Sequence, residues 1–217
     1  VKQGVLRVLL FLLRMPDLEV ERCASLAIAG LSLGSDRNKA ELIDNGFIYP
    51  LVDTIAYPDA RIRQCALLAL NGISLGEEQD TKGSILKDEK CLSSLMNLIK
   101  SDSDDESIFL SMYMLGTLAF NGDIRDTIIA LDGCLQRIVD ITSTGSIEIK
   151  RAAAYFLSIL SESLDYHDNL QQVGGLEAAV RLSSLVDEEC QDYGTLMLAF
   201  LANNKDFQVP LVNMGAI

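Results

Sequence analysis

The sequence predicts an all-α solenoid, a right-handed superhelix of about five three-helix repeats. Two observations support this. The segment 23–34 returns at 65–76 with eight of twelve positions identical, at an offset of 42 residues. A Gly followed two residues later by Leu or Ile also recurs, at positions 4, 46, 133, 174 and 215. Self-similarity at a fixed period of this length is typical of stacked repeats.

The glycine marker sets the register of the repeats. Lys90 takes the place of the Gly once, so repeats start near 4, 46, 90, 133, 174 and 215, and both ends of the chain fall within a repeat. No composition shift or linker interrupts the series. We therefore expect a single repeat domain over 1–217, whose exposed ends could pair with a second copy of the chain.

Each repeat is expected to contain three helices. A short first helix, at 38–44 in the second repeat, precedes the Gly, which permits a sharp left-handed turn. A second helix follows, in which apolar residues recur three and four positions apart. Pro16 and Pro58 end this helix, and Asp17 and Asp59 are placed to cap the third one. The third repeat differs, because 101–107 is an acidic loop that caps a helix or contacts a basic partner.

Composition excludes several classes of function. The net charge is −13 and the pI is about 4.4, which argues against nucleic acid and anionic membranes as partners. The longest apolar run, 5–13, is far shorter than the roughly 20 residues of a membrane span. Five widely spaced cysteines, without a CxxC pair, indicate neither a disulfide framework nor a zinc site. We expect them to be small buried side chains of a protein in the cytoplasm.

Catalysis finds little support in the sequence. The single histidine, His167, falls in a Tyr-His-Asp segment that we expect to be a surface loop. No glycine-rich phosphate loop, HExxH motif or nucleophile elbow is present. The abundant carboxylates stand in turns and at helix starts, where capping explains them. We predict that the protein is not an enzyme and has no cofactor and no metal site.

The period, the three-helix unit and the Gly-x-Leu start resemble the armadillo repeat over essentially the whole chain. HEAT repeats are the nearest rival, but they lack the short first helix and the glycine turn. The resemblance implies that proteins or peptides bind in a groove lined by the third helices. Import receptors of this family carry a Trp and an Asn four residues apart on these helices. The chain has no Trp and lacks the Asn ladder, which argues against import-signal binding.

The end of the chain has a narrower resemblance. The segments 174–178, 204–209 and 214–216 are similar to the armadillo-repeats-only proteins of apicomplexan parasites. This resemblance implies an adaptor on the cytosolic face of the rhoptry organelle that recruits a myosin motor. Membrane attachment would then come only from an acylated N-terminus outside this chain.

The candidate site lies on the third helices. Aromatic residues appear there in the third and fourth repeats, and we expect Tyr113 and Tyr155, flanked by Arg151 and Glu162, to form its centre. The alternative is that Phe109 and Phe120 belong to the core and only the tyrosines reach solvent. The full set of predicted groove residues is Arg22, Gln64, Asn71, Phe109, Tyr113, Thr117, Phe120, Arg151, Tyr155, Glu162, Asp192 and Asn203.

The sequence therefore favours a non-enzymatic scaffold or adaptor that docks proteins, and in its specific form tethers them to an organelle surface. Two alternatives remain open at this point. One is a peptide binder of the nuclear transport type, and the other is a regulatory subunit of an enzyme complex.

Overall fold

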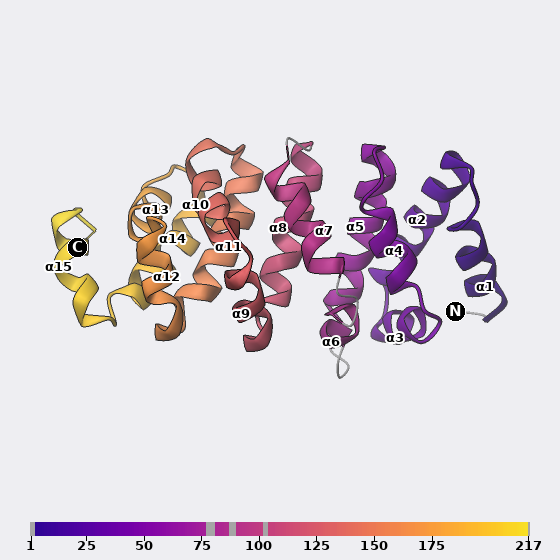
Figure 1. Cartoon of the computed structure of the whole chain (residues 1–217), viewed down its shortest axis with the longest axis horizontal. Helices are drawn as coiled ribbons and strands as arrows, with labels where there is room; N and C mark the ends of the chain where they lie inside the picture. The colour runs from indigo at the N-terminus through magenta and orange to yellow at the C-terminus, as the bar shows by residue number, and fades with distance from the viewer. Residues whose placement is uncertain (1–2, 77–80, 87–89, 102–103, 217) are drawn as a thin grey trace. The chain divides into compact units, whose positions relative to one another are not determined.

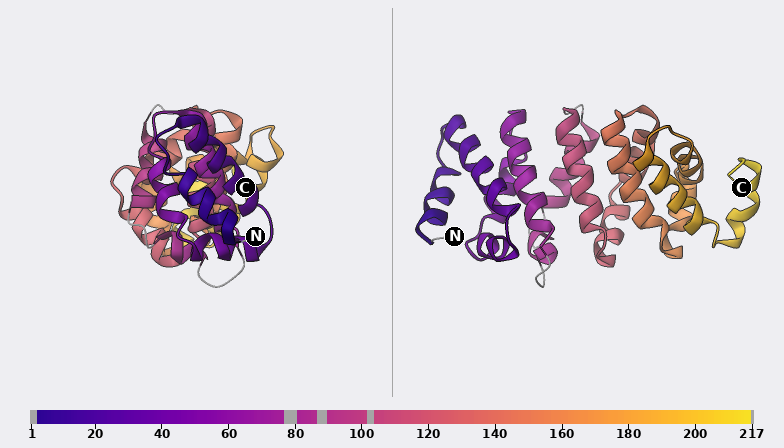
Figure 2. Two further views of the ribbon diagram at one scale, coloured as in Figure 1. Left: turned by 90° about the vertical axis from the view of Figure 1, so that its right-hand side faces the viewer. Right: turned by 180° about the vertical axis from the view of Figure 1, so that it is seen from behind.

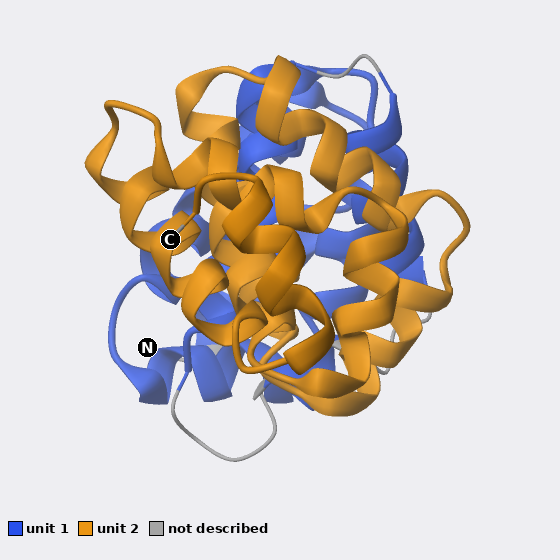
Figure 3. Cartoon of the chain, turned by 90° about the vertical axis from the view of Figure 1, so that its left-hand side faces the viewer, with its two compact units in different colours: residues 1–114 blue, residues 115–217 orange. Residues whose placement is uncertain are grey.

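The computed structural model describes residues 3–76, 81–86, 90–101 and 104–216, and all regular structure within them is helical (Figure 1). The chain divides into two compact units, 1–114 and 115–217, and the boundary falls inside the helix Asp105–Leu118 (Figure 3). Each unit has its own set of packed helices.

Unit 1 begins with the second and third helices of one repeat and continues with two further repeats. Its helices are α1 (Gln3–Leu12), α2 (Leu18–Ser32), α3 (Asp36–Asp44), α4 (Ile48–Thr54), α5 (Ala60–Ser74), α6 (Thr81–Leu86), α7 (Lys90–Lys100) and the first part of α8 (Asp105–Leu118).

Unit 2 continues the same alternation of short and long helices. It contains the end of α8, then α9 (Gly122–Ala130), α10 (Cys134–Thr144), α11 (Ile147–Ser161), the 3-10 turn η1 (Leu164–Tyr166), α12 (His167–Gln172), α13 (Gly175–Ser183), α14 (Glu188–Leu201) and α15 (Lys205–Asn213).

The cap signals and four of the five glycine turns are confirmed, whereas Gly4 lies inside the helix α1 and does not have a positive φ. Gly46, Gly133, Gly174 and Gly215 all have positive φ, between 64° and 80°, so the marker glycine reverses the chain where the short first helix ends. The carboxylate of Asp17 accepts hydrogen bonds from the first turn of α2. Asp59 caps α5 in the same way. These local signals explain where the short first helices end and where the third helices begin. The second helices α1 and α4 end at Leu12 and Thr54, four residues before Pro16 and Pro58, so the prediction that proline ends them is wrong.

The long third helices form the centre of each unit. Within unit 1, α2 lies alongside α5, and within unit 2, α11 lies alongside α14 (Figure 1, Figure 2). The predicted apolar face of α4 is buried: Ile48, Leu51, Val52 and Ile55 are at most 5% exposed. One face of each amphipathic helix is therefore shielded by its neighbours, as stacked repeats require.

The structure corrects the prediction for His167. Its side chain is 1% exposed, and its Nε2 lies 2.8 Å from the carbonyl oxygen of Ser161. The ring stacks on Phe207 of α15, with centroids 5.5 Å apart. The expected surface loop is instead the start of α12, the short first helix of the fifth repeat, and this helix turns His167 toward the interior.

The prediction of uniformly buried cysteines is also wrong. All five are free thiols, but Cys23 is exposed and Cys65 is half-buried, whereas Cys91, Cys134 and Cys190 are buried. Cys23 and Cys65 directly follow Arg22 and Gln64 on the third helices. They occupy equivalent positions near the surface edge of α2 and α5, so small size alone does not place them in the core.

Glu21 of α2 supplies a prediction on stability. Its side chain is 4% exposed, and the hydroxyl of Thr54 donates to its Oε1 at 3.4 Å. Burial raises the pKa of Glu21, although hydrogen bonds from Thr54 and Tyr57 act in the opposite direction. A raised folded-state pKa means that the stabilisation is present at acid pH and is lost as the pH rises through that pKa.

We therefore expect Glu21→Gln to raise the free energy of unfolding at pH 7 by about 1 kcal/mol. Urea unfolding of both proteins measures the difference. It should shrink toward zero below about pH 4, where the unfolded carboxyl also becomes protonated. If Glu21→Gln is less stable than the parent at pH 7, burial is not the dominant influence on the pKa of Glu21.

Candidate protein-binding surface

Three aromatic side chains of unit 2, Phe120, Tyr155 and Tyr193, form a cluster that we call the aromatic cluster. The ring centroids of Phe120 and Tyr155 are 6.4 Å apart with a 54° interplanar angle. Those of Tyr155 and Tyr193 are 5.5 Å apart with a 55° angle. These tilted geometries are favourable for aromatic pairs. Phe120 is 56% exposed and both tyrosines are half-buried, so the cluster is ordered by mutual packing and reaches the surface.

Gly116 of α8 makes room for the central ring. A Cβ built on Gly116 would lie 2.6 Å from both Cδ1 and Cε1 of Tyr155. The ring of Tyr155 therefore lies against bare backbone, which holds it between Phe120 and Tyr193. The small residue in α8 and the large one in α11 are complementary in shape.

We expect Gly116→Ala to displace the Tyr155 ring and to cost about 1–3 kcal/mol of stability. The matched test is a double-mutant cycle with Tyr155→Ala, measured by chemical unfolding. In the Tyr155→Ala background both ring atoms are gone and the added methyl group lies 3.7 Å from Cα of Phe156, an ordinary contact distance, so the penalty should largely disappear. Equal penalties in both backgrounds would show that the clash is not with Tyr155.

A charged network lies one helical turn before Tyr155. Nη2 of Arg151 donates to Oδ2 of Asp187 at 2.6 Å, and its Nη1 lies 3.7 Å from Glu189. Asp187 also accepts a hydrogen bond from the backbone N–H of Cys190, in the first turn of α14. The hydrogen bond from Arg151 holds the pKa of Asp187 well below its usual range. Burial, together with the nearby Asp187, raises the pKa of Cys190 to about 12, so this thiol is inert at neutral pH.

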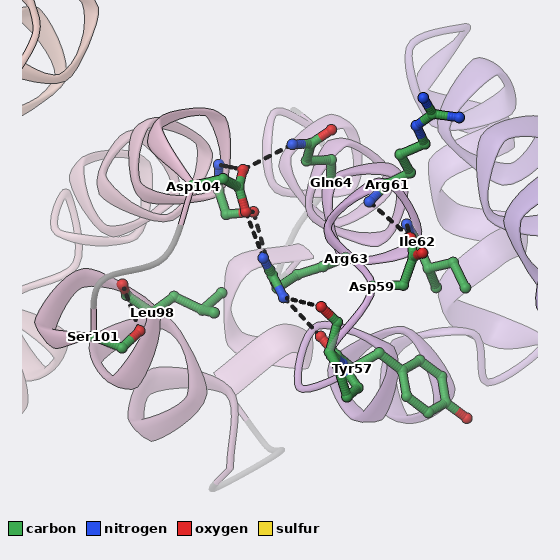
Figure 4. A network of polar contacts seen from close by, with 11 residues as sticks. Tyr57, Asp59, Arg61, Ile62, Arg63, Gln64, Leu98, Ser101 and Asp104 are labelled. Atoms are coloured by element: carbon green, nitrogen blue, oxygen red, sulfur yellow. Dashed lines mark hydrogen bonds and ion pairs between the residues drawn. The ribbon is translucent and has the colours of Figure 1, made fainter.

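Unit 1 contains a comparable network around Arg63 (Figure 4). The guanidinium of Arg63 donates to the carboxylate of Asp104, to the hydroxyl of Ser107 at 3.1 Å and to the carbonyl oxygen of Tyr57 at 2.8 Å. Nε2 of Gln64 donates to Oδ1 of Asp104 at 2.7 Å. The same carboxylate accepts the backbone N–H of Ser107. Asp104 therefore orders the start of α8 and joins it to α5.

The two networks have the same arrangement of side chains. In each, a residue in the second turn of a third helix donates to the aspartate at the start of the next third helix, Gln64 to Asp104 and Arg151 to Asp187. Arg22, at the equivalent position of α2, instead pairs with Glu19 of its own helix at 2.7 Å. Arg22, Gln64 and Arg151 were predicted to contact a partner, but Gln64 and Arg151 join successive third helices.

The remaining predicted site residues differ in exposure. Tyr113, Phe120, Glu162, Asp192 and Asn203 are exposed, and Phe109 is half-buried. The alternative that placed Phe120 in the core is therefore wrong. In unit 1, Phe109 and Tyr113 form a separate ring pair with centroids 6.2 Å apart.

Asn71 and Thr117 are only 6% and 3% exposed. Nδ2 of Asn71 donates to the carbonyl oxygens of Leu67 and Leu110, each at 3.0 Å. These two residues support the helices and are not available as contact residues.

Tyr193 was not predicted as a site residue, because the residues at the equivalent positions of the other repeats are not aromatic and the repeat register gives no signal for it.

Two absences hold for the residues that the structure describes. Among them, no helix is both long and apolar enough to cross a membrane. They also contain no group of three or more His, Cys, Asp or Glu side chains placed to hold a metal ion.

Comparison with known proteins establishes the fold. No protein-family model and no curated protein sequence matches the chain. The fold is similar to that of an engineered protein solved by crystallography, with a TM-score of 0.88, 23% identity and coverage of 98% of this chain and 87% of that one. A designed armadillo repeat protein matches with a TM-score of 0.87, 21% identity and coverage of 97% and 88%. Another, in complex with the peptide (KR)4, matches with a TM-score of 0.83, 24% identity and coverage of 91% and 82%.

The chain therefore has the all-α armadillo-repeat solenoid fold that its sequence predicts. At these identities the likeness establishes the fold and not the partner.

Proposed function

We propose that the protein is a non-enzymatic scaffold or adaptor that binds a protein segment on the third-helix surface of unit 2. The observation that carries this proposal is the aromatic cluster. Its three rings come from near the end of α8, from α11 and from α14, they are held in fixed geometry, and they reach the surface. Ordered, partly exposed Tyr and Phe side chains are the residues on which protein interfaces most depend, because they bury large areas at low conformational cost.

The structural comparison supports the same type of function. A designed armadillo repeat protein with a similar fold is described as a complex with a peptide, so this helical arrangement can present a peptide-binding surface. The networks at Asp104 and Asp187 favour such a role. They fix α5 to the start of α8 within unit 1 and α11 to α14 within unit 2, and a rigid pair of helices reduces the entropy lost on binding.

The test is the affinity of Tyr155→Ala for a partner recovered by pull-down with the intact chain. We expect Kd to rise at least tenfold, because truncation of a central aromatic anchor costs about 2 kcal/mol or more. Isothermal titration calorimetry measures the change. Tyr49→Ala is the matched control, since Tyr49 is 59% exposed on α4 of unit 1. Equal affinities of both variants, with helical circular dichroism intact, would place the binding surface elsewhere.

The narrower form of the proposal is an organelle tether. It rests on the similarity of 174–178, 204–209 and 214–216 to the armadillo-repeats-only proteins of apicomplexan parasites. In this form the protein sits in the cytoplasm on the rhoptry surface, recruits a myosin motor and is held by an acylated N-terminus. Mass spectrometry and membrane fractionation of the full-length protein from its native cells test it. An unacylated protein that stays in the soluble fraction would contradict the proposed tethering role and would leave the proposed adaptor role standing.

A further inference from the structure

His167 is a buried imidazole with one bonded and one unbonded nitrogen. A carbonyl oxygen only accepts hydrogen bonds, so Nε2 of His167 carries a proton and donates it to the carbonyl oxygen of Ser161. Nδ1 is buried and has no hydrogen-bond partner among the described residues. The ring is therefore assigned as the neutral tautomer with its proton on Nε2. A second proton would place a positive charge and an unpaired N–H group in the interior of unit 2, which burial penalises.

Among the described residues, no charged side chain is placed to compensate this second proton, because none forms a hydrogen bond or an ion pair with the ring. The elements packed around it are η1, α9, α13, α15 and the end of α11. Arg125 and Asp126 of α9 engage Tyr166, and Arg181 of α13 donates to Thr142. The other charged side chains of these elements and of α12 are exposed, and they are Asp123, Glu162, Asp165, Asp168, Glu177, Lys205 and Asp206.

The helix α15 is attached to the rest of unit 2 in part through this ring. Its buried residues are Phe207 and Leu211. Phe207 is 1% exposed and stacks on His167 with a 19° interplanar angle. The helix has nine residues and contains Pro210, so it is too short to be stable without packing. A change in the charge of His167 therefore acts on a contact that keeps α15 folded.

We propose that His167 forms a pH-sensitive contact: α15 packs against α12 while the imidazole is neutral, and protonation of the ring at mildly acidic pH releases the helix. An imidazole that is exposed to water takes up a proton near pH 6.5. The ring is exposed in the released state, whereas the docked ring offers its second proton no acceptor. The released state therefore binds more protons, and it gains population as the pH falls. Release should be about tenfold more favourable at pH 5.5 than at pH 7.5, because the exposed ring changes from mostly neutral to mostly protonated over this range.

Hydrogen–deuterium exchange of the intact chain, followed by mass spectrometry, measures the release. Protection factors correct for the pH dependence of intrinsic exchange, and those of the α15 amides should fall about tenfold between pH 7.5 and pH 5.5. The internal control is α3, the short first helix of a repeat in unit 1. Its protection should not fall, because the raised pKa of Glu21 stabilises that unit as the pH decreases.

Two variants identify the group that takes up the proton. His167→Phe keeps a flat ring against Phe207 but cannot be protonated, so the protection of α15 in this variant should be the same at both pH values. Asp168→Asn removes the exposed carboxylate next to His167 in the sequence, and it should retain the tenfold change of the parent.

Nuclear magnetic resonance of the parent tests the ring directly. His167 is the only histidine in the chain, so all imidazole nitrogen signals come from this residue. At pH 7.5 they should show a proton on Nε2 and none on Nδ1. The proposal is overturned if Nδ1 carries the proton at this pH, or if the ring is doubly protonated at pH 5.5 while α15 keeps its protection. It is also overturned if the protection of α15 in the parent does not change with pH, or if His167→Phe shows the same change as the parent.

Discussion

Gly194→Ala is expected to be among the most destabilising single-methyl changes in the chain. A Cβ at Gly194 in α14 would lie 2.4 Å from the backbone nitrogen of Ser183 and 2.8 Å from the carbonyl carbon of Leu182. Both are main-chain atoms at the end of α13, so no side-chain rotation can relieve the contact. The two helices must separate, and we expect a loss of about 3 kcal/mol in the free energy of unfolding. Chemical unfolding followed by circular dichroism measures it.

Gly30→Ala is the matched control for this prediction. Gly30 lies inside α2, and a Cβ there would have no other atom within 4 Å. Alanine is the better helix former, so this variant should gain about 0.5–1 kcal/mol. The gain from helix propensity applies to both positions, and the difference between the variants therefore isolates the steric contact. If Gly194→Ala and Gly30→Ala have similar free energies of unfolding, α13 and α14 do not pack as closely as the distances at Gly194 indicate.

The elements predicted correctly are those with local causes. The glycine marker needs only a positive φ at the end of a short helix, and Gly46, Gly133 and Gly174 have it. Asp17 and Asp59 bond to backbone groups two and three residues away. Such signals lie within one turn of chain and recur with the period, so the fold can be read from the sequence.

The parts of the candidate site that were not predicted depend on contacts between repeats. Tyr193 of α14 joins the aromatic cluster because its ring packs against that of Tyr155 in the neighbouring helix α11. The equivalent positions of the other repeats are not aromatic, so the sequence pattern does not indicate this contact. His167 is buried because α15 brings Phe207 against its ring. Periodicity assigns a residue to one side of its helix. Whether that side is buried in the core, takes part in a polar network or is exposed depends on the neighbouring helix that packs against it.

The second large effect is expected at the Arg63 network. Arg63 is 9% exposed, and in Arg63→Met the Asp104 carboxylate loses the cation that it pairs with inside unit 1. The side chain of Asp104 is 29% exposed, so loss of its partner leaves a partly buried charge uncompensated, and we expect a cost of about 2 kcal/mol at pH 7. Urea unfolding measures it. Burial alone would raise the pKa of Asp104, but hydrogen bonds from Gln64, Arg63 and Ser107 outweigh it and hold that pKa well below its usual range.

The depressed pKa gives this prediction a pH signature. A carboxylate with a lowered folded-state pKa stabilises the protein above the unfolded value of about 3.9, and that stabilisation is lost as the pH falls. The difference between the parent and Arg63→Met should therefore be largest near neutrality and should narrow in acid. Arg22→Met is the matched control, because Arg22 pairs with the exposed Glu19 and exposed pairs contribute at most about 1 kcal/mol. If both variants lose the same small amount, or if the loss at Arg63 does not change with pH, the ion pair to Asp104 is not what joins α5 to α8.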